Sequence, residues 1–361
     1  MKATETLHDE GQSLWLDNIT RDLLQSGTLK RYISDLSVTG LTSNPTIFDH
    51  AIKNSSSYDA AIRMKAKEGK SGEDLFFELA IEDVTRAADL FRPIWDRTHG
   101  VDGWVSLEVS PVLAHDTAST LAAAKALHAR AGRPNLFIKI PGTKEGLPAI
   151  EEAIFAGIPI NVTLLFSHQQ YLAAAEAFLR GIERRVEAGM DPEVGSVASV
   201  FISRWDTAVK DKVPADLRNE LGIAIAKKTY KAYRTLLGSP RWQRVFNEGA
   251  RPQRLLWAST GTKDPGASDV LYVRALAAPF TVNTMPEGTL KALADHGSSG
   301  GILTADGGDS EKVLARFAAA GVDVDALATT LQDEGAKSFV ASWIELMDVI
   351  ASKTAALDKA S

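Results

Sequence analysis

The chain contains the segment Leu136-Phe137-Ile138-Lys139-Ile140-Pro141, a short apolar run with one lysine, bounded by Asn135 and Gly142. Runs of this length between turn-forming residues are typical of a strand buried on both faces. Lysine is rarely buried without a partner, and burial favours the neutral, nucleophilic form of its amine, which can attack a ketone. Taken alone, the segment also fits a lysine whose stem packs on apolar surface while its head reaches water or a carboxylate.

Similar apolar segments recur along the whole chain. Eight can be identified, at residues 14–19, 38–43, 104–109, 136–141, 158–166, 196–203, 255–260 and 280–284. Stretches with helical spacing separate most of them, such as residues 117–130, 169–188 and 217–237. This alternation predicts parallel strands joined by crossover helices. Eight such strands indicate an α/β fold of the (β/α)8 TIM barrel type. A doubly wound open sheet is the alternative, but its usual glycine-rich first turn is absent from the sequence.

The chain has 361 residues, more than the ~250 that are typical of a barrel. The surplus lies about residues 51–100, after the second strand, and about residues 300–361, and both regions have helical patterns. In the first, Ser71 and Asp74 resemble a capping box ahead of a helix at residues 75–91. No linker marks a boundary. We therefore expect one barrel domain over residues 1–361, with a helical insertion and a C-terminal helical tail.

Composition excludes several classes of function. The net charge is −6, and the Lys and Arg residues are scattered, so neither a nucleic acid nor a membrane is indicated as a partner. Without cysteine there is no thiolate nucleophile or Cys-ligated metal, and the seven histidines lack paired metal spacing. Residues 1–12 are polar, and no apolar stretch approaches the ~20 residues of a spanning helix. We expect a soluble, cytoplasmic protein; a homodimer is compatible with the sequence but not indicated by it.

Polar residues interrupt the predicted strands at matching positions. Because side chains alternate between the two faces of a strand, residues of one parity point into a barrel. Near the ends of five segments, the parity opposite the aliphatic side chains is occupied by Asp17, Thr42 with Asn44, Glu108, Lys139, and Asn161 with Thr163. The C-terminal ends of barrel strands are where barrel enzymes build their active sites. These side chains are therefore predicted to converge around Lys139.

This set of residues suits catalysis through a Schiff base. Such a lysine needs an acid/base for carbinolamine formation and dehydration, for which Glu108 is the candidate. Carbon–carbon cleavage beside the imine needs a base for a hydroxyl proton, and Asp17 is the candidate. Water or substrate hydroxyls could be oriented by Thr42, Asn44, Asn161 and Thr163. Arg204 and Lys263 follow the sixth and seventh strands and could bind an anionic group of the substrate.

The same segments resemble the transaldolase family of class I aldolase-type enzymes. The resemblance rests on motifs that lie in order over most of residues 14–260: Asp17-Asn18-Ile19, Gly40-Leu41-Thr42-Ser43-Asn44-Pro45-Thr46-Ile47-Phe48, Ser106-Leu107-Glu108-Val109, Ile138-Lys139-Ile140-Pro141, Asn161-Val162-Thr163-Leu164-Leu165-Phe166 and Ser199-Val200-Phe201-Ile202-Ser203-Arg204. The family has a circularly permuted barrel with the lysine on its fourth strand, and Lys139 lies in the fourth segment here. The Thr-Ser-Asn-Pro and Asn-x-Thr-Leu-Leu-Phe motifs are specific to the family.

The resemblance implies a role for each matching residue. Lys139 forms the Schiff base, Glu108 is the acid/base, Asp17 handles the C4 hydroxyl proton and Thr163 holds the catalytic water. The dihydroxyacetone unit is contacted by Thr42, Asn44 and Asn161, while Ser199 and Arg204 bind phosphate and Phe201 stands where transferring members carry phenylalanine. Many members have a second phosphate-binding arginine soon after the seventh strand. This chain, like the longer bacterial members, has a longer loop there, and Lys263 is assigned that role.

The expected activity is transfer of a dihydroxyacetone unit from a ketose phosphate to an aldose phosphate, in the non-oxidative pentose phosphate pathway. The resemblance implies sugar-phosphate substrates and no cofactor or metal. A simple aldolase that releases free dihydroxyacetone is the first alternative, and assays with and without an acceptor aldehyde separate the two. A non-catalytic sugar-phosphate-binding barrel is the second, but it would not need Lys139, Glu108 and Asp17 together.

Overall fold

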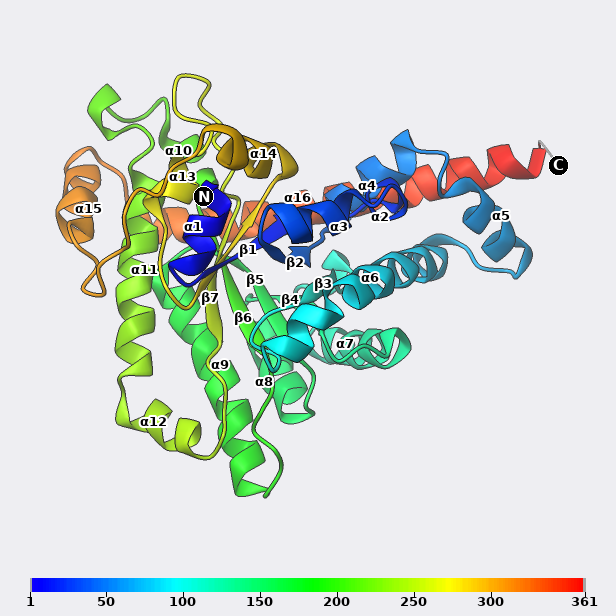
Figure 1. The fold of residues 1–361 in the computed structure, drawn as a ribbon, viewed down its shortest axis with the longest axis horizontal. Coiled ribbons are helices and arrows are strands. Elements are labelled where there is room, and N and C mark those ends of the chain that lie inside the picture. The colour runs from blue at the N-terminus through cyan, green and yellow to red at the C-terminus, as the bar shows by residue number, and fades with distance from the viewer. Residues whose placement is uncertain (1, 360–361) are drawn as a thin grey trace.

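The structure is a computed structural model and describes residues 2–359 (Figure 1). Its centre is a closed barrel of parallel strands that follow one another in chain order. The strands are β1 (Gln12–Asp17), β2 (Val38–Thr42), β3 (Val105–Glu108), β4 (Leu136–Pro141), β5 (Ile160–Leu165), β6 (Ser196–Phe201), β7 (Arg254–Ala258) and β8 (Thr281–Met285). Each lies within or overlaps a predicted segment, so the predicted (β/α)8 barrel is confirmed.

Helices cover the outside of the barrel. They are α1 (Ala3–Asp9), α2 (Arg21–Gln25), α3 (Thr28–Asp35), α4 (Pro45–Asn54), α5 (Asp59–Lys67), α6 (Gly72–Arg97), α7 (Thr117–Ala131), α8 (Gly146–Phe155), α9 (His168–Glu187), α10 (Ser203–Val209), α11 (Leu221–Leu237), α12 (Pro240–Asn247), α13 (Leu271–Ala275), α14 (Glu287–His296), α15 (Ser310–Ala319) and α16 (Val324–Lys359), with short 3-10 turns at Pro111–Leu113 and Ala215–Leu217. The predicted helical stretches correspond to α7, α9 and α11.

The predicted capping box at the start of α6 is wrong. Ser71 occupies the N-cap position, but its side chain makes no capping hydrogen bond. Gly72, the first helical residue, has a left-handed φ of 50°, so the first turn departs from regular geometry. The helix itself is longer than predicted and continues through Pro93 to Arg97.

Strand register places the predicted site residues at one level of the barrel. Lys139 on β4 is paired with Glu108 on β3 and with Asn161 on β5. Asp17 on β1 is likewise paired with Thr42 on β2. Since neighbouring parallel strands here carry their polar residues at paired positions, the side chains meet inside the same end of the barrel.

The two helical regions outside the regular barrel pack against each other. In Figure 1, α16 crosses the molecule and runs beside α4 and α5. The Trp343 ring on α16 lies against Phe76 and Phe77 of α6, with centroid distances of 5.0 and 5.8 Å. Farther along α16, the Lys353 ammonium group donates hydrogen bonds to the Ser55 carbonyl and the Asp59 carboxylate, at 2.6 and 3.0 Å. That all of residues 1–361 form one domain stays a prediction.

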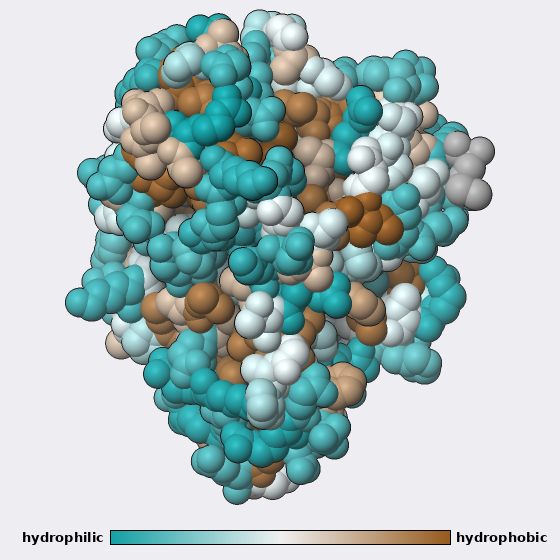
Figure 2. All heavy atoms as spheres, turned by 90° about the vertical axis from the view of Figure 1, so that its left-hand side faces the viewer, coloured by the Kyte–Doolittle hydropathy of each residue, from teal (hydrophilic) through white to brown (hydrophobic). Residues whose placement is uncertain are grey.

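The face in Figure 2 is mostly hydrophilic, with groups of apolar side chains between the polar ones. Large apolar residues are exposed at scattered positions along the chain, among them Leu172, Met190 and Phe246. Within residues 2–359, no helix combines the length and the apolar character needed to cross a membrane.

Candidate active site

A small cavity opens at the C-terminal ends of the strands, around the buried Lys139. Its volume is about 130 Å³. Nine of the residues predicted from the sequence line it: Asp17, Thr42, Asn44, Lys139, Thr163, Ser199, Phe201, Arg204 and Lys263. Two others, Glu108 and Asn161, lie next to the lining residues instead of on the cavity wall. The cavity thus brings together side chains from β1, β2, β4, β5 and β6 with residues that follow β6 and β7.

The head of Lys139 is removed from water. Only 5% of the residue is exposed, and its Nζ donates a hydrogen bond to the Ser43 carbonyl at 3.1 Å. A Glu108 carboxylate oxygen lies 3.2 Å from Nζ and forms an ion pair with it. The Phe339 ring faces the same nitrogen, with its centroid 6.0 Å away. The sequence left open whether the head of Lys139 reaches water or a carboxylate, and the structure shows a carboxylate.

Two carboxyl groups in the site have pKa values raised above those of exposed carboxyl groups. Burial raises the pKa of Glu108, although the ammonium group of Lys139 partly opposes the shift. Burial also raises the pKa of Asp17, against the charge of Lys139 and a hydrogen bond from Thr42 Oγ1 at 2.7 Å. Carboxyl groups with raised pKa values can exchange protons with a substrate near neutral pH, as general acid–base catalysis requires.

The hydroxyl and amide groups of the site differ in how many of their hydrogen bonds are made to other protein groups. Asn161 donates to Ser106 Oγ at 3.1 Å and accepts from Ser199 Oγ at 2.7 Å. Asn44 uses its Oδ1 to cap α4 at the Ile47 amide, which leaves its NH₂ group for the cavity. Thr163 Oγ1 is buried without a hydrogen-bond partner in the described part of the chain. A buried hydroxyl without a protein partner is suited to bind water or substrate.

Two cations stand at the mouth of the cavity. The Arg204 guanidinium lies over the rings of Phe201 and Phe339, at 5.1 and 5.7 Å from their centroids, and makes no hydrogen bond or ion pair within residues 2–359. Burial lowers the pKa of Arg204. A partly buried guanidinium without an acidic partner is suited to bind a phosphate.

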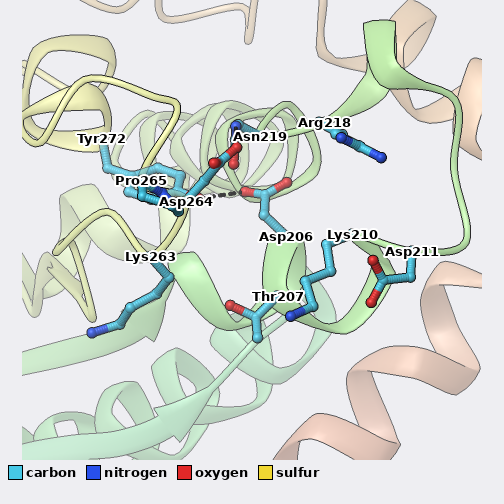
Figure 3. A pocket seen from close by; sticks show the side chains of 10 residues that line it. All are labelled: Asp206, Thr207, Lys210, Asp211, Arg218, Asn219, Lys263, Asp264, Pro265 and Tyr272. Atoms are coloured by element: carbon cyan, nitrogen blue, oxygen red, sulfur yellow. Dashed lines mark hydrogen bonds between the residues drawn. The ribbon is translucent and has the colours of Figure 1, made fainter.

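Lys263 is exposed and lies on the boundary between this cavity and a second pocket. Figure 3 shows that second pocket, in which the ammonium group of Lys263 points away from Asp206, Thr207 and Lys210. The next residue, Asp264, accepts a hydrogen bond from Asn219 Nδ2 at 2.8 Å and so ties the Lys263 loop to the segment before α11.

Known proteins match this chain over nearly its whole length. The sequence model of the transaldolase/fructose-6-phosphate aldolase family matches residues 14–350. The chain belongs to this family. It is 46% identical over 358 residues to a transaldolase of Acidothermus cellulolyticus, covering 97% of this chain and 95% of that protein. It is also 46% identical over 361 residues to a transaldolase of Thermobifida fusca, covering 98% of each. A transaldolase of Mycolicibacterium smegmatis is 44% identical over 347 residues, covering 94% of each chain.

Some residues around this family member's cavity were not predicted from its sequence. Ser259, Gly261, Thr284, Pro286 and Phe339 also line it. Thr284 ends a predicted strand, and its Oγ1 is hydrogen-bonded to Thr42 Oγ1 at 2.6 Å. It shares parity with the apolar Phe280 and Val282, so strand parity would have selected Asn283 instead. Phe339 comes from α16, far along the chain from any strand, and no local pattern distinguishes it from an ordinary helix residue.

Proposed function

We propose that this chain is a transaldolase that uses Lys139 as a Schiff-base nucleophile. It takes a dihydroxyacetone unit from sedoheptulose 7-phosphate or fructose 6-phosphate and transfers it to glyceraldehyde 3-phosphate or erythrose 4-phosphate. The observation that carries the proposal is the buried Lys139 with the Glu108 carboxylate 3.2 Å away, in a cavity that also contains Asp17. The transaldolase relatives support the same reaction.

The first step forms the imine. Glu108 takes a proton from the ammonium group of Lys139. The neutral amine then attacks the ketone carbon of the donor, and proton transfer from nitrogen to oxygen gives a carbinolamine. Loss of the hydroxyl group as water requires an acid, and Glu108 supplies that proton from beside Nζ. Thr163, whose hydroxyl is free of protein partners within residues 2–359, holds the water that takes part in this exchange.

The second step breaks the bond between C3 and C4 of the donor. Asp17 accepts the C4 hydroxyl proton, the bond electrons move into the imine to form an enamine, and the shortened aldose leaves. The acceptor aldehyde then enters, the enamine attacks its carbonyl carbon, and the steps run in reverse. Thr42, Asn44 and Asn161 hold the hydroxyl groups of the dihydroxyacetone unit, the first two from the cavity wall. The mechanism needs no cofactor.

The phosphate of donor and acceptor is bound at the cavity mouth. Arg204 supplies a planar group that can bind phosphate with two hydrogen bonds, and Lys263 adds a positive charge. Ser199 lies near Arg204 on the wall of the same cavity and is the further phosphate contact implied by the family resemblance.

Phe201 favours transfer over hydrolysis. Phe201 is 7% exposed and lines the cavity, and its ring lies tilted against the ring of Phe166 with a centroid distance of 5.4 Å. An apolar ring at this position excludes water that would otherwise hydrolyse the covalent intermediate.

A matched pair of assays tests the proposal. With fructose 6-phosphate and erythrose 4-phosphate, the protein is expected to form sedoheptulose 7-phosphate and glyceraldehyde 3-phosphate. With fructose 6-phosphate alone, it should release little free dihydroxyacetone, and Phe201→Tyr should increase that release. Rapid release by the unchanged protein would favour the aldolase alternative, and ligand binding without turnover would favour a non-catalytic barrel. A cytoplasmic location and a single domain complete the proposal.

A further inference from the structure

Strand β5 is irregular immediately after Thr163. Its pairing with β6 shifts between Val162 and Leu165, where two residues of β5 lie opposite one residue of β6. Leu164 has a left-handed φ of 58°, which is unfavourable for a leucine, and it is almost fully buried. Such a conformation persists only where surrounding contacts hold it. The residue that precedes it, Thr163, is the one proposed to hold the water.

One side chain of the C-terminal helix is hydrogen-bonded to the backbone at this irregularity of β5. Gln332 on α16 uses its Nε2 group to donate hydrogen bonds to the Leu164 carbonyl at 2.9 Å and to the Gly142 carbonyl at 3.2 Å. Gly142 directly follows β4, and its amide donates to the Thr163 carbonyl at 2.8 Å. A single amide group therefore joins the ends of the two strands that carry Lys139 and Thr163.

The position of Gln332 is fixed by close packing of α16. Leu331, beside it, is 4% exposed and belongs to the same apolar cluster as Leu164. One turn later, Gly335 lies so near the barrel that an added Cβ would stand 3.0 Å from a Leu164 methyl carbon and 3.1 Å from Arg204 Nη1. The helix thus reaches the cavity through a residue without a side chain, and it brings Gln332 within reach of both carbonyl groups.

We propose that Gln332 is a positioning residue, which holds the ends of β4 and β5 so that the Thr163 hydroxyl points into the cavity at a fixed distance from Lys139. This inference rests on the proposed function, because it assumes that Thr163 holds the reacting water. Gln332 itself does not line the cavity. It acts on the reaction through the backbone of Leu164.

The test compares two glutamine substitutions. Gln332→Met keeps the length of the side chain and removes both donated hydrogen bonds. Gln169→Met is the matched control, because Gln169 on α9 also donates to the start of α16, at Asp325 Oδ1 and 2.9 Å, but contacts neither β4 nor β5 through this hydrogen bond and does not line the cavity. Gln332→Met is expected to lower kcat roughly 10- to 100-fold, as small displacements of catalytic groups do. KM for the donor should change less than about twofold, because the groups that bind it are untouched. The control should leave both constants unchanged.

A double-mutant cycle with Thr163→Val decides whether Gln332 acts through Thr163. Imine formation is followed by borohydride trapping on Lys139 in a single turnover. If the inference is right, Gln332→Met slows trapping when Thr163 is present, but does not slow it further in a protein that already carries Thr163→Val. Equal slowing in both backgrounds, or no slowing in either, overturns it. Absence of trapping in the unchanged protein would instead refute the proposed function. Gln332→Glu, which keeps the shape and loses the donors, gives a second measurement where Gln332→Met does not fold.

Discussion

Two carboxyl groups lie in the site of Lys139, and we propose different roles for them because their surroundings differ. Glu108 forms an ion pair with Nζ, so it can serve proton transfers at the nitrogen and at the carbinolamine oxygen. Asp17 accepts a hydrogen bond from Thr42 and lines the cavity, and its proposed partner is the C4 hydroxyl of the donor. Burial raises the pKa of both groups. A raised pKa suits each carboxyl group to exchange protons with a substrate.

Glu108→Gln and Asp17→Asn are expected to fail at different steps. Each should reduce kcat by roughly 10²- to 10⁴-fold, the usual contribution of general acid–base catalysis. Glu108→Gln should slow trapping of the imine, because its acid is lost. Asp17→Asn should still form the imine and stop before carbon–carbon cleavage. Rapid-quench trapping, together with measurement of the released aldose, distinguishes the two variants. Equal loss of trapping in both would contradict the division of roles.

Arg204 and Lys263 are expected to contribute unequally to phosphate binding. Arg204→Ala should raise KM for fructose 6-phosphate by about tenfold or more, because it removes a charge-assisted contact, and should barely affect fructose. Lys263→Ala should have a smaller effect, since it removes an exposed point charge. Arg218→Ala, which removes an exposed cation from the neighbouring pocket, is the control and should leave KM unchanged. An equal effect of Arg204→Ala on both sugars would make Arg204 structural.

Among the elements, α11 is held at its N-terminus by a buried carboxylate from α10. Asp206 accepts hydrogen bonds from the amides of Leu221 and Gly222 at 2.9 and 3.2 Å, and from the Tyr272 hydroxyl at 2.9 Å. Its side chain points toward Tyr272 in Figure 3. Burial raises the pKa of Asp206 to about 6, from 3.8 in an exposed chain. The contacts of one carboxyl group, which join α10, α11 and α13, therefore depend on pH.

The sign of this coupling can be measured. Because the folded protein binds the Asp206 proton more tightly than the unfolded chain does, this group stabilises the fold most below pH 3.8 and progressively less as the pH rises to about 6. The free energy of unfolding of the unchanged protein, relative to Asp206→Asn, should therefore fall by about 2 kcal/mol between pH 4 and pH 7. Denaturant titrations at both pH values check this. Asp211→Asn, an exposed carboxylate in the same pocket, should show no such difference.

Across the whole molecule, the strands could be predicted because each is a local pattern. A buried parallel strand appears in the sequence as a short apolar run, and alternation of faces then places Asp17, Glu108 and Lys139 inside the barrel. The contribution of α16 could not be predicted in this way. Gln332 and Phe339 reach the site because a distant helix packs across the barrel mouth, and that packing depends on contacts such as Gly335 with Leu164, which no local spacing records.

The left-handed conformation of Leu164 could also not be predicted from the alternation of side chains along the strand. The Asn161-Val162-Thr163 stretch alternates as a regular strand, and the sequence gives no glycine or proline to mark the break that follows. The left-handed conformation is imposed by tertiary contacts, among them the hydrogen bond from Gln332. Local patterns therefore predict most of the residues that line the cavity, while long-range packing determines how they are held.

The central claim is that Lys139 forms an imine with the donor, and borohydride reduction followed by peptide mass spectrometry tests it most directly. After incubation with fructose 6-phosphate and borohydride, the account predicts a reduced dihydroxyacetone adduct on the peptide that contains Lys139. Lys139→Arg, which stays charged at working pH, should fold, give no adduct and have no transferase activity. An adduct on another lysine, or turnover by a folded Lys139→Arg variant, would contradict the account.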